Sequence, residues 1–132
     1  MAGQRKPKRN RAPARKRILL VDDQADLLAA LELFFKRYNF EVVCAFDGVE
    51  ALARIEEQLP DLLITDHLMP RMTGLQLCAY LRARADTRHL PIILHSSLPF
   101  SRAEGLYDQS ILKASPLGEL HALVCALLSL TH

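Results

Sequence analysis

Five polar residues are candidates for chemistry if the fold brings them together. Asp22 and Asp23 follow an aliphatic run, and Asp66, Ser96 and Lys113 come at the ends of three later apolar runs. Clustered carboxylates raise one another's pKa values unless a cation shares the site, and such oxygen ligands favour Mg²⁺ or Mn²⁺. A hydroxyl and an ammonium opposite them would hold an anion attached to one carboxylate. This set of residue types indicates phosphoryl transfer to an Asp, in which positioning and charge neutralisation supply most of the catalysis.

Short apolar runs alternate along the chain with longer segments of helical periodicity. The runs predicted to be strands are Ile18–Val21, Phe40–Phe46, Asp61–Asp66, Ile92–His95 and Ile111–Lys113. This alternation predicts an α/β fold, a doubly wound five-stranded parallel sheet with the strand order 2-1-3-4-5 and helices on both faces. In that order ligands bind beyond the carboxyl ends of the strands, beside strands one and three. The five polar residues should therefore meet at one edge of the sheet.

The helices predicted after the fourth and fifth strands differ in strength. A closing helix from about Pro116 has a clear apolar face, formed by Leu120, Leu123, Val124, Leu127 and Leu128. The segment from Leu98 to Gln109, by contrast, holds Pro99 and Gly105 and few apolar residues. It leaves room for at most a short helix around Ser101–Tyr107, so we predict that the fourth helix is short or irregular.

The composition fits one domain in a reducing compartment. A chain of 132 residues, 50% hydrophobic and 24% charged, leaves no room for a second core, which excludes a multidomain enzyme. Its three cysteines are widely separated and form no C-x-x-C motif, which favours a reducing cytosol. The apolar runs are too short for a secretion signal or a membrane span. We therefore expect a cytoplasmic protein that does not insert into a membrane.

The charge is distributed unevenly along the chain. Residues 1–17 hold eight Lys/Arg and no acid, whereas the rest holds nine Lys/Arg and fifteen Asp/Glu, a net charge of −6. We predict a basic disordered tail over residues 1–16 and a single domain over residues 17–132. The tail could bind nucleic acid, an anionic membrane surface or an acidic partner, or be only a solvated extension. Nucleic acid is expected to bind through this tail alone, if it binds at all.

The spacing of the polar residues carries a resemblance to a known family. The motif positions are the acidic pair Asp22 and Asp23, an acceptor Asp66 with Met69, Pro70 and Gly74 in a D-x-x-M-P signature, Ser96, and Lys113. From residue 17 to about residue 130 the sequence resembles the receiver domain of bacterial two-component response regulators, which has a flavodoxin-like fold. The single-domain chemotaxis regulators are the nearest type.

The resemblance implies a role for each matching position. Asp66 would accept a phosphoryl group from a histidine kinase or a histidine phosphotransfer protein. Asp23, Asp66 and the backbone carbonyl of Leu68 would bind Mg²⁺, with Asp22 acting through water. Ser96 and Lys113 would hold the phosphoryl oxygens. The chain would then be a stand-alone receiver that signals by binding another protein. It would be a phosphoacceptor that assists its own phosphorylation and dephosphorylation, not a classical enzyme.

Four positions bear on how such a receiver would behave. Ala114 follows the lysine where the family has Pro, and Ser110 stands where the family has an aromatic residue that swings inward on activation. With the weak fourth helix, these differences favour an alternative, a pseudo-receiver that acts as a phosphorylation-independent interaction module. Leu68 and Leu98 flank the acceptor, where aliphatic side chains exclude water, so we predict slow self-dephosphorylation.

Other protein classes fit the motifs less well. A phosphatase with an aspartate nucleophile would need a D-x-D motif where Asp22, Asp23 and Gln24 stand. A flavin carrier would need a phosphate-binding loop rich in Ser, Thr or Gly after the first strand. An intermediate of a phosphorelay, or a receiver excised from a longer hybrid kinase, is compatible with the same residues.

Overall fold

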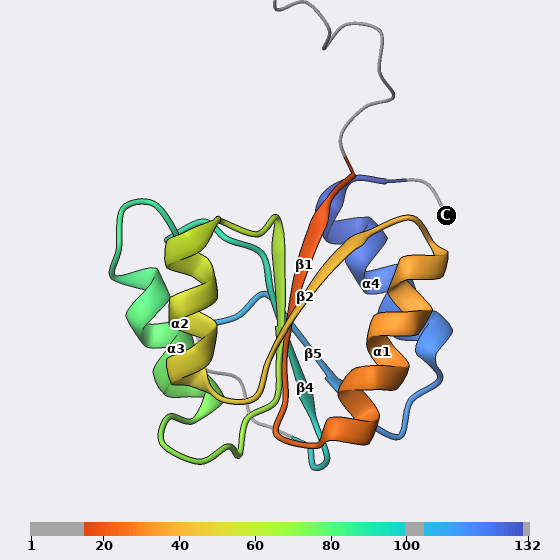
Figure 1. Cartoon of the computed structure of the whole chain (residues 1–132), viewed down its shortest axis with the longest axis horizontal. Coiled ribbons are helices and arrows are strands. Elements are labelled where there is room, and N and C mark those ends of the chain that lie inside the picture. Colours follow the sequence, from red (N-terminus) through yellow and green to blue (C-terminus); the bar gives the residue numbers. More distant parts are fainter. Residues whose placement is uncertain (1–14, 100–104, 131–132) are drawn as a thin grey trace, which may run out of the picture.

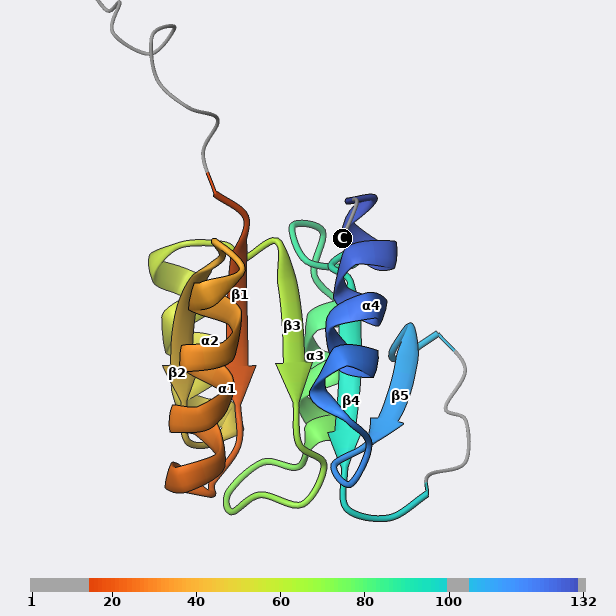
Figure 2. The same cartoon turned by 90° about the vertical axis from the view of Figure 1, so that its right-hand side faces the viewer.

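A parallel sheet separates two layers of helices in the computed structural model of the chain, which describes residues 15–99 and 105–130 (Figure 1). The helices α2 (Gly48–Glu57) and α3 (Gly74–Arg82) lie on one face of the sheet. The helices α1 (Ala25–Arg37) and α4 (Leu117–Leu128) lie on the other face (Figure 2). None of the helices described is long and apolar enough to cross a membrane.

The sheet has the predicted topology. Its strands are β1 (Arg17–Val21), β2 (Glu41–Ala45), β3 (Leu62–Thr65), β4 (Ile92–Ser96) and β5 (Gln109–Leu112). They pair in parallel in the order β2-β1-β3-β4-β5, which confirms the predicted doubly wound sheet. The fifth strand begins two residues earlier than predicted and ends just before Lys113. All five strands therefore point their carboxyl ends toward the same edge (Figure 2).

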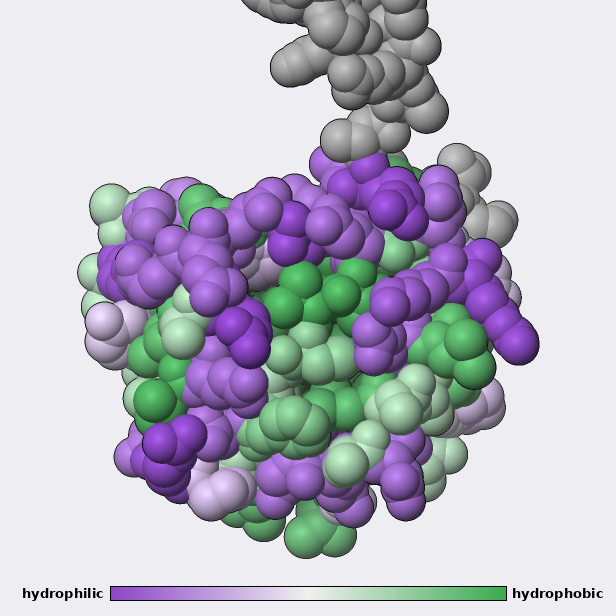
Figure 3. All heavy atoms as spheres, in the orientation of Figure 1, coloured by the Kyte–Doolittle hydropathy of each residue, from purple (hydrophilic) through white to green (hydrophobic). Residues whose placement is uncertain are grey.

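The core has two layers because the side chains of a strand alternate between its faces. Leu19, Leu63 and Ile92 belong to the layer under α2 and α3, whereas Leu20 and Ile64 belong to the layer under α1 and α4. The strands β1, β3 and β4 are consequently buried on both sides, as strands in the middle of a parallel sheet must be. The strand β2 is half-buried and forms an edge, where Figure 3 shows apolar residues between two hydrophilic borders.

The helix starts differ in how they are capped. The Asp47 side chain accepts a hydrogen bond from the Glu50 N–H at the start of α2. Thr73 and Gln76 form a reciprocal capping box at the start of α3. Both devices stabilise a helix start by satisfying backbone N–H groups. The N-cap of α1 is Gln24, whose side chain makes no such bond within the described part of the chain.

The region between β4 and β5 carries no helix within its described residues. The predicted short helix at Ser101–Tyr107 lies partly outside the described residues, because residues 100–104 are not among them. Residues 105 and 106 form a turn and Asp108 a bend, which agrees with the prediction that the fourth helix is short or irregular. Arg82 covers the turn from α3, donating to the carbonyls of Leu90 at 2.7 Å and Gly105 at 3.1 Å and to the Asp108 carboxylate at 3.1 Å.

The closing helix α4 packs with the predicted face inward. Leu120 and Val124 are buried, and Leu123, Leu127 and Leu128 are half-buried against the same core. The predicted disordered tail, residues 1–16, lies outside the described residues apart from its last two positions. The chain enters β1 at Arg17, whose backbone N–H donates to Asp61 and whose guanidinium pairs with Glu41 at 2.8 Å.

Candidate functional site

The predicted polar residues gather where the carboxyl ends of the strands meet. These strand ends lie at the lower end of the sheet in Figure 2. A cavity of about 420 Å³ opens at them. Its lining includes Asp23, Gln24, Asp66, His67, Leu68, Ser96, Ser97, Leu98, Pro99 and Lys113. Asp22 lies beside the cavity and contacts Lys113. The structure thus brings all five candidates into one site from four different strand ends.

Three carboxylates form the acidic side of the site. Asp22, Asp23 and Asp66 each offer an oxygen within 4.8 Å of the others. Asp22 and Asp66 are buried, and Asp23 is exposed. The Asp22 N–H donates to Ala45 at 3.1 Å and the Asp66 N–H donates to Val21 at 2.9 Å, so both aspartates continue the strand ladder by one residue. This donor set of hard oxygens fits a divalent cation such as Mg²⁺.

Lys113 forms the cationic side of the site. Its ammonium lies 2.7 Å from the Asp22 carboxylate, 3.2 Å from the Asp66 carboxylate and 2.9 Å from the Gln24 amide oxygen. Its backbone N–H donates to the Ser96 carbonyl at 2.7 Å. The peptide bond to Ala114 is trans, as are the other peptide bonds of the described segments. A Pro is therefore not needed after the lysine for its ammonium to reach Asp66.

Burial and charge shift the pKa values of the two central groups. Burial raises the pKa of Asp66, the charge of Asp22 raises it further, and Lys113 and the His67 N–H oppose the shift. Burial lowers the pKa of Lys113, but the hydrogen bonds and charges of Asp22 and Asp66 outweigh it and leave that pKa above its usual value. Lys113 therefore stays charged and balances the acidic side.

Ser96 and Leu98 close the cavity on the β4 side. The Ser96 hydroxyl oxygen accepts a hydrogen bond from the Leu98 N–H at 3.3 Å, and Ser96 is buried. Leu98 is 67% exposed, and Leu68, on the opposite loop, is 69% exposed. Both leucines line the cavity, so its mouth is apolar on two sides.

The loop after β3 is held against the start of α3. The Gly74 N–H donates to the His67 carbonyl at 2.7 Å. A Cβ at Gly74 would overlap the Asp66 carbonyl oxygen and lie 2.9 Å from the His67 Cα. The glycine of the loop signature is therefore needed because the start of α3 and the backbone of Asp66 and His67 touch. The predicted ligand role of the Leu68 carbonyl stays a prediction.

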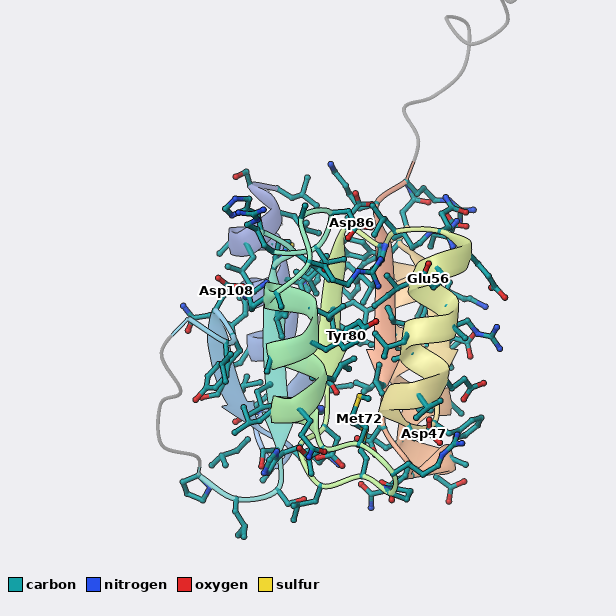
Figure 4. The ribbon with its side chains drawn as sticks, turned by 90° about the vertical axis from the view of Figure 1, so that its left-hand side faces the viewer. Asp47, Glu56, Met72, Tyr80, Asp86 and Asp108 are labelled. Atoms are coloured by element: carbon teal, nitrogen blue, oxygen red, sulfur yellow. The ribbon has the colours of Figure 1, made fainter. Side chains whose placement is uncertain are left out.

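Sequence reasoning missed two contacts of the site. The motif assigns no role to Gln24. Its position directly after Asp23 nevertheless indicated that it lies at the same strand end. The second contact is an ion pair in which Arg71, with φ of 69°, donates to Asp47 at 2.6 and 3.0 Å. It joins the acceptor loop to α2, and Met72 lies between the starts of α2 and α3 (Figure 4). Nothing in the spacing of Asp47 and Arg71 indicated this pair.

Comparison with known proteins agrees with this geometry. The family model described as the response regulator receiver domain matches residues 18–104. The chain is 37% identical over 117 residues to the phosphate regulon transcriptional regulatory protein PhoB of Rhizobium meliloti, covering 85% of this chain and 52% of PhoB. It is 30% identical over 94 residues to protein PilG of Pseudomonas aeruginosa, covering 71% and 66%. The chain thus spans about half the length of PhoB.

Solved structures show the same relationship. The signal receiver domain of a histidine kinase from Syntrophus aciditrophicus matches with a TM-score of 0.81 and 31% identity, over 86% of this chain and 90% of that chain. The response regulator TrrA of Thermotoga maritima, in complex with Mg(2+)-BeF, matches with a TM-score of 0.78 and 29% identity, over 85% and 98%. Together with the matched family, which spans more than half of the sequence, these likenesses show that the chain belongs to the response regulator receiver domains of two-component systems.

Proposed function

We propose that the protein is a receiver that accepts a phosphoryl group on Asp66 from the phosphohistidine of a histidine kinase or a phosphotransfer protein. The observation that supports this most is the position of Lys113, which bridges Asp66 and Asp22 beside a cavity open to a donor. Asp66 is a buried carboxylate nucleophile with a cation fixed at hydrogen-bond distance. That cation is already in place to stabilise the charge that develops on the phosphoryl oxygens during the transfer.

The transfer needs few groups from the protein. A carboxylate oxygen of Asp66 attacks the phosphorus, the phosphorus–nitrogen bond of the donor breaks, and the released imidazole takes up a proton from water. Lys113 neutralises a phosphoryl oxygen, and the Ser96 hydroxyl, whose oxygen accepts from the Leu98 N–H and whose proton has no acceptor among the described residues, donates to another. Because the positions are set before the donor arrives, little reorganisation is required.

The metal role falls to the acidic side of the site. Asp23, Asp66 and the Leu68 carbonyl would hold Mg²⁺, and Asp22 would act through water. The close pairing of Asp22 with Lys113 supports the indirect role, because this carboxylate already has a partner. The ion supplies charge neutralisation for the transferred group. TrrA, described with Mg(2+)-BeF, supports the choice of metal.

The output is proposed to be binding to another protein, by a cytoplasmic receiver that acts alone or as an intermediate of a phosphorelay. Relatives such as PhoB are longer and are named as transcriptional regulators, so attachment to a further domain is the competing arrangement. The receiver would assist its own slow dephosphorylation. Any contact with nucleic acid is assigned to the basic residues before Arg17.

Intact mass after incubation with Mg²⁺ and acetyl phosphate tests the acceptor. We expect a gain of one phosphoryl group in the wild type, no gain in Asp66→Asn, and no gain when the metal is chelated. Asp61→Asn is the matched control, because Asp61 lies at the opposite end of β3. Phosphorylation that persists in Asp66→Asn would refute the assignment.

A pseudo-receiver is the second candidate, and one observation favours it. The described residues between β4 and β5 contain no helix, and Ser110 on β5 is exposed. A wild type that gains no phosphoryl group but still binds Mg²⁺ would support this function over the first.

A further inference from the structure

The Lys113 ammonium has one partner that the proposed function does not use. A lysine ammonium has three N–H donors. The structure supplies three acceptors, the carboxylates of Asp22 and Asp66 and the side-chain amide oxygen of Gln24 at 2.9 Å. The geometry therefore saturates the ammonium, and the third bond comes from a neutral residue 89 positions away in the sequence.

Gln24 makes this bond instead of capping its own helix. It is the N-cap of α1, where its carbonyl accepts from the Leu28 N–H at 3.0 Å, but its side chain makes no bond to the first turn. Asp47 and Thr73 fill the same position in α2 and α3 and do cap. Ser, Thr, Asp and Asn are the preferred residues here, and a Gln side chain brings no comparable stabilisation. The residue is thus poorly suited to the helix and well placed for the lysine.

The backbone of Gln24 fixes where its side chain begins. The Gln24 N–H donates to the Asp22 carboxylate at 2.9 Å, and the other oxygen of that carboxylate contacts Lys113. Asp22 is buried, so this small ring of contacts starts from a rigid point at the end of β1. Lys113, in contrast, follows β5, a short edge strand with mostly exposed residues, and has a long flexible side chain.

We propose that Gln24 is a positioning residue that keeps the Lys113 ammonium above Asp66 while the two carboxylates change partners. This inference rests on the proposed function, in which Asp66 becomes phosphorylated and the acidic group serves a cation. Both events alter the carboxylates that now hold the lysine. The Gln24 amide is uncharged and takes no part in either, so its bond persists through the cycle.

Three substitutions test this role. Gln24→Met keeps the side-chain length and removes the acceptor. Gln24→Ser removes the acceptor and introduces a good N-cap. Gln24→Glu keeps an acceptor at the same reach but adds a charge, so it serves as the rescue of the Lys113 contact alone. Gln58→Met is the matched control, because Gln58 follows α2 and lines a different surface.

Three readouts separate positioning from stability. Phosphorylation by acetyl phosphate should slow about five- to tenfold in Gln24→Met and Gln24→Ser, the effect of losing one hydrogen bond to a partly exposed charge. The ¹H–¹⁵N NMR signal of the Lys113 ammonium should weaken in both and persist in Gln24→Glu. The melting temperature should rise in Gln24→Ser, because α1 gains a cap. Activity and stability would then move in opposite directions.

Each contrary result has a distinct meaning. A Lys113 signal and a phosphorylation rate that are unchanged in both Gln24→Met and Gln24→Ser would overturn the proposal. So would losses of rate and melting temperature that run in parallel, since a structural role alone explains them. A wild type that is never phosphorylated would refute the proposed function, and the Lys113 signal would still decide whether Gln24 holds the lysine.

Discussion

Leu68 and Leu98 determine what kind of environment surrounds a phosphoryl group on Asp66. Both are largely exposed, yet both line the cavity that contains the acceptor. Neither side chain can hydrogen-bond a water molecule and aim it at phosphorus. At the scale of single residues, we therefore predict that a phosphoryl group on Asp66 would be lost slowly.

Leu68→Asn should accelerate loss of the phosphoryl group about tenfold, because an amide can orient an attacking water. The measurement is the decay of the phosphorylated mass after the donor is removed. Leu59→Asn is the control, since Leu59 is an exposed leucine that lines a different pocket. An unchanged decay rate in Leu68→Asn would show that a group other than Leu68 limits the attack of water on the phosphoryl group.

His95 links the site to the pH dependence of stability. It is buried on β4, and its pKa is lowered to about 4 by burial and then by the charge of Lys113, with Asp22 opposing the shift. The unfolded chain takes up this proton near pH 6.5, whereas the folded chain does so only near pH 4. The contribution of neutral His95 to stability is therefore complete above pH 6.5 and is lost as the pH falls toward 4.

The free energy of unfolding should fall by at most about 3 kcal/mol across this window because of His95. Urea unfolding at a series of pH values, compared with His95→Leu, isolates the contribution. We expect the difference between the two proteins to change between pH 6.5 and 4 and to stay constant above pH 7. A constant difference throughout would mean that His95 titrates normally in the folded protein.

At the scale of elements, the acceptor loop is positioned by the helix that follows it. The start of α3 touches the backbone of Asp66 and His67, and the Arg71–Asp47 ion pair ties the same loop to α2. The loop is consequently held from two sides. A change at either helix start should be felt at the acceptor even though no functional side chain is altered.

Gly74→Ala should lower the free energy of unfolding by about 2 kcal/mol or more, because its Cβ would overlap backbone atoms that cannot move independently. Chemical denaturation measures this loss of stability. We also expect the Gly74→Ala variant to bind Mg²⁺ more weakly, because the loop after β3 is displaced. Gly118→Ala in α4 is the control. A Cβ there meets nothing within 4 Å, so a gain of up to about 1 kcal/mol is expected.

Arg82 holds the described turn before β5 in place. Its guanidinium bonds carbonyls of the α3–β4 connection and pairs with Asp108, which also accepts from the Ile92 N–H at 2.8 Å. Figure 4 shows Asp108 beside the start of β5, across from α3. One side chain thus joins α3, β4 and the turn before β5.

Arg82→Ala should lower the free energy of unfolding by about 2 kcal/mol, since the half-buried Leu90 carbonyl and the exposed acceptors Gly105 and Asp108 lose their donor at once. Arg84→Ala is the control because Arg84 pairs with the exposed carboxylates of Glu56 and Asp86, and its loss should be clearly smaller. Equal losses in the two variants would mean that Arg82 is no more than a surface ion pair.

At the scale of the whole molecule, the sheet was predictable and some of its connections were not. Aliphatic runs that end in acids or a lysine predict buried parallel strands, and a parallel sheet places their ends together, which is why Asp22, Asp66 and Lys113 meet. Pro99 and Gly105 predicted the irregular segment before β5, but the bonds from Arg82 that hold its turn were not predictable, because they join residues distant in sequence. Gln24 was missed for the same reason, since its partner follows another strand.

The parallel sheet also gives the molecule two separate ends. Arg17 lies at the amino end of β1, and the acidic cavity lies at the carboxyl end, about one strand length of 16 Å away. Seven Lys/Arg precede Arg17 in the sequence. A partner that binds at Arg17 and the neighbouring amino ends of the strands would leave the cavity facing the solution. A partner at the amino ends of the strands would therefore not compete for surface with a phosphodonor at the cavity.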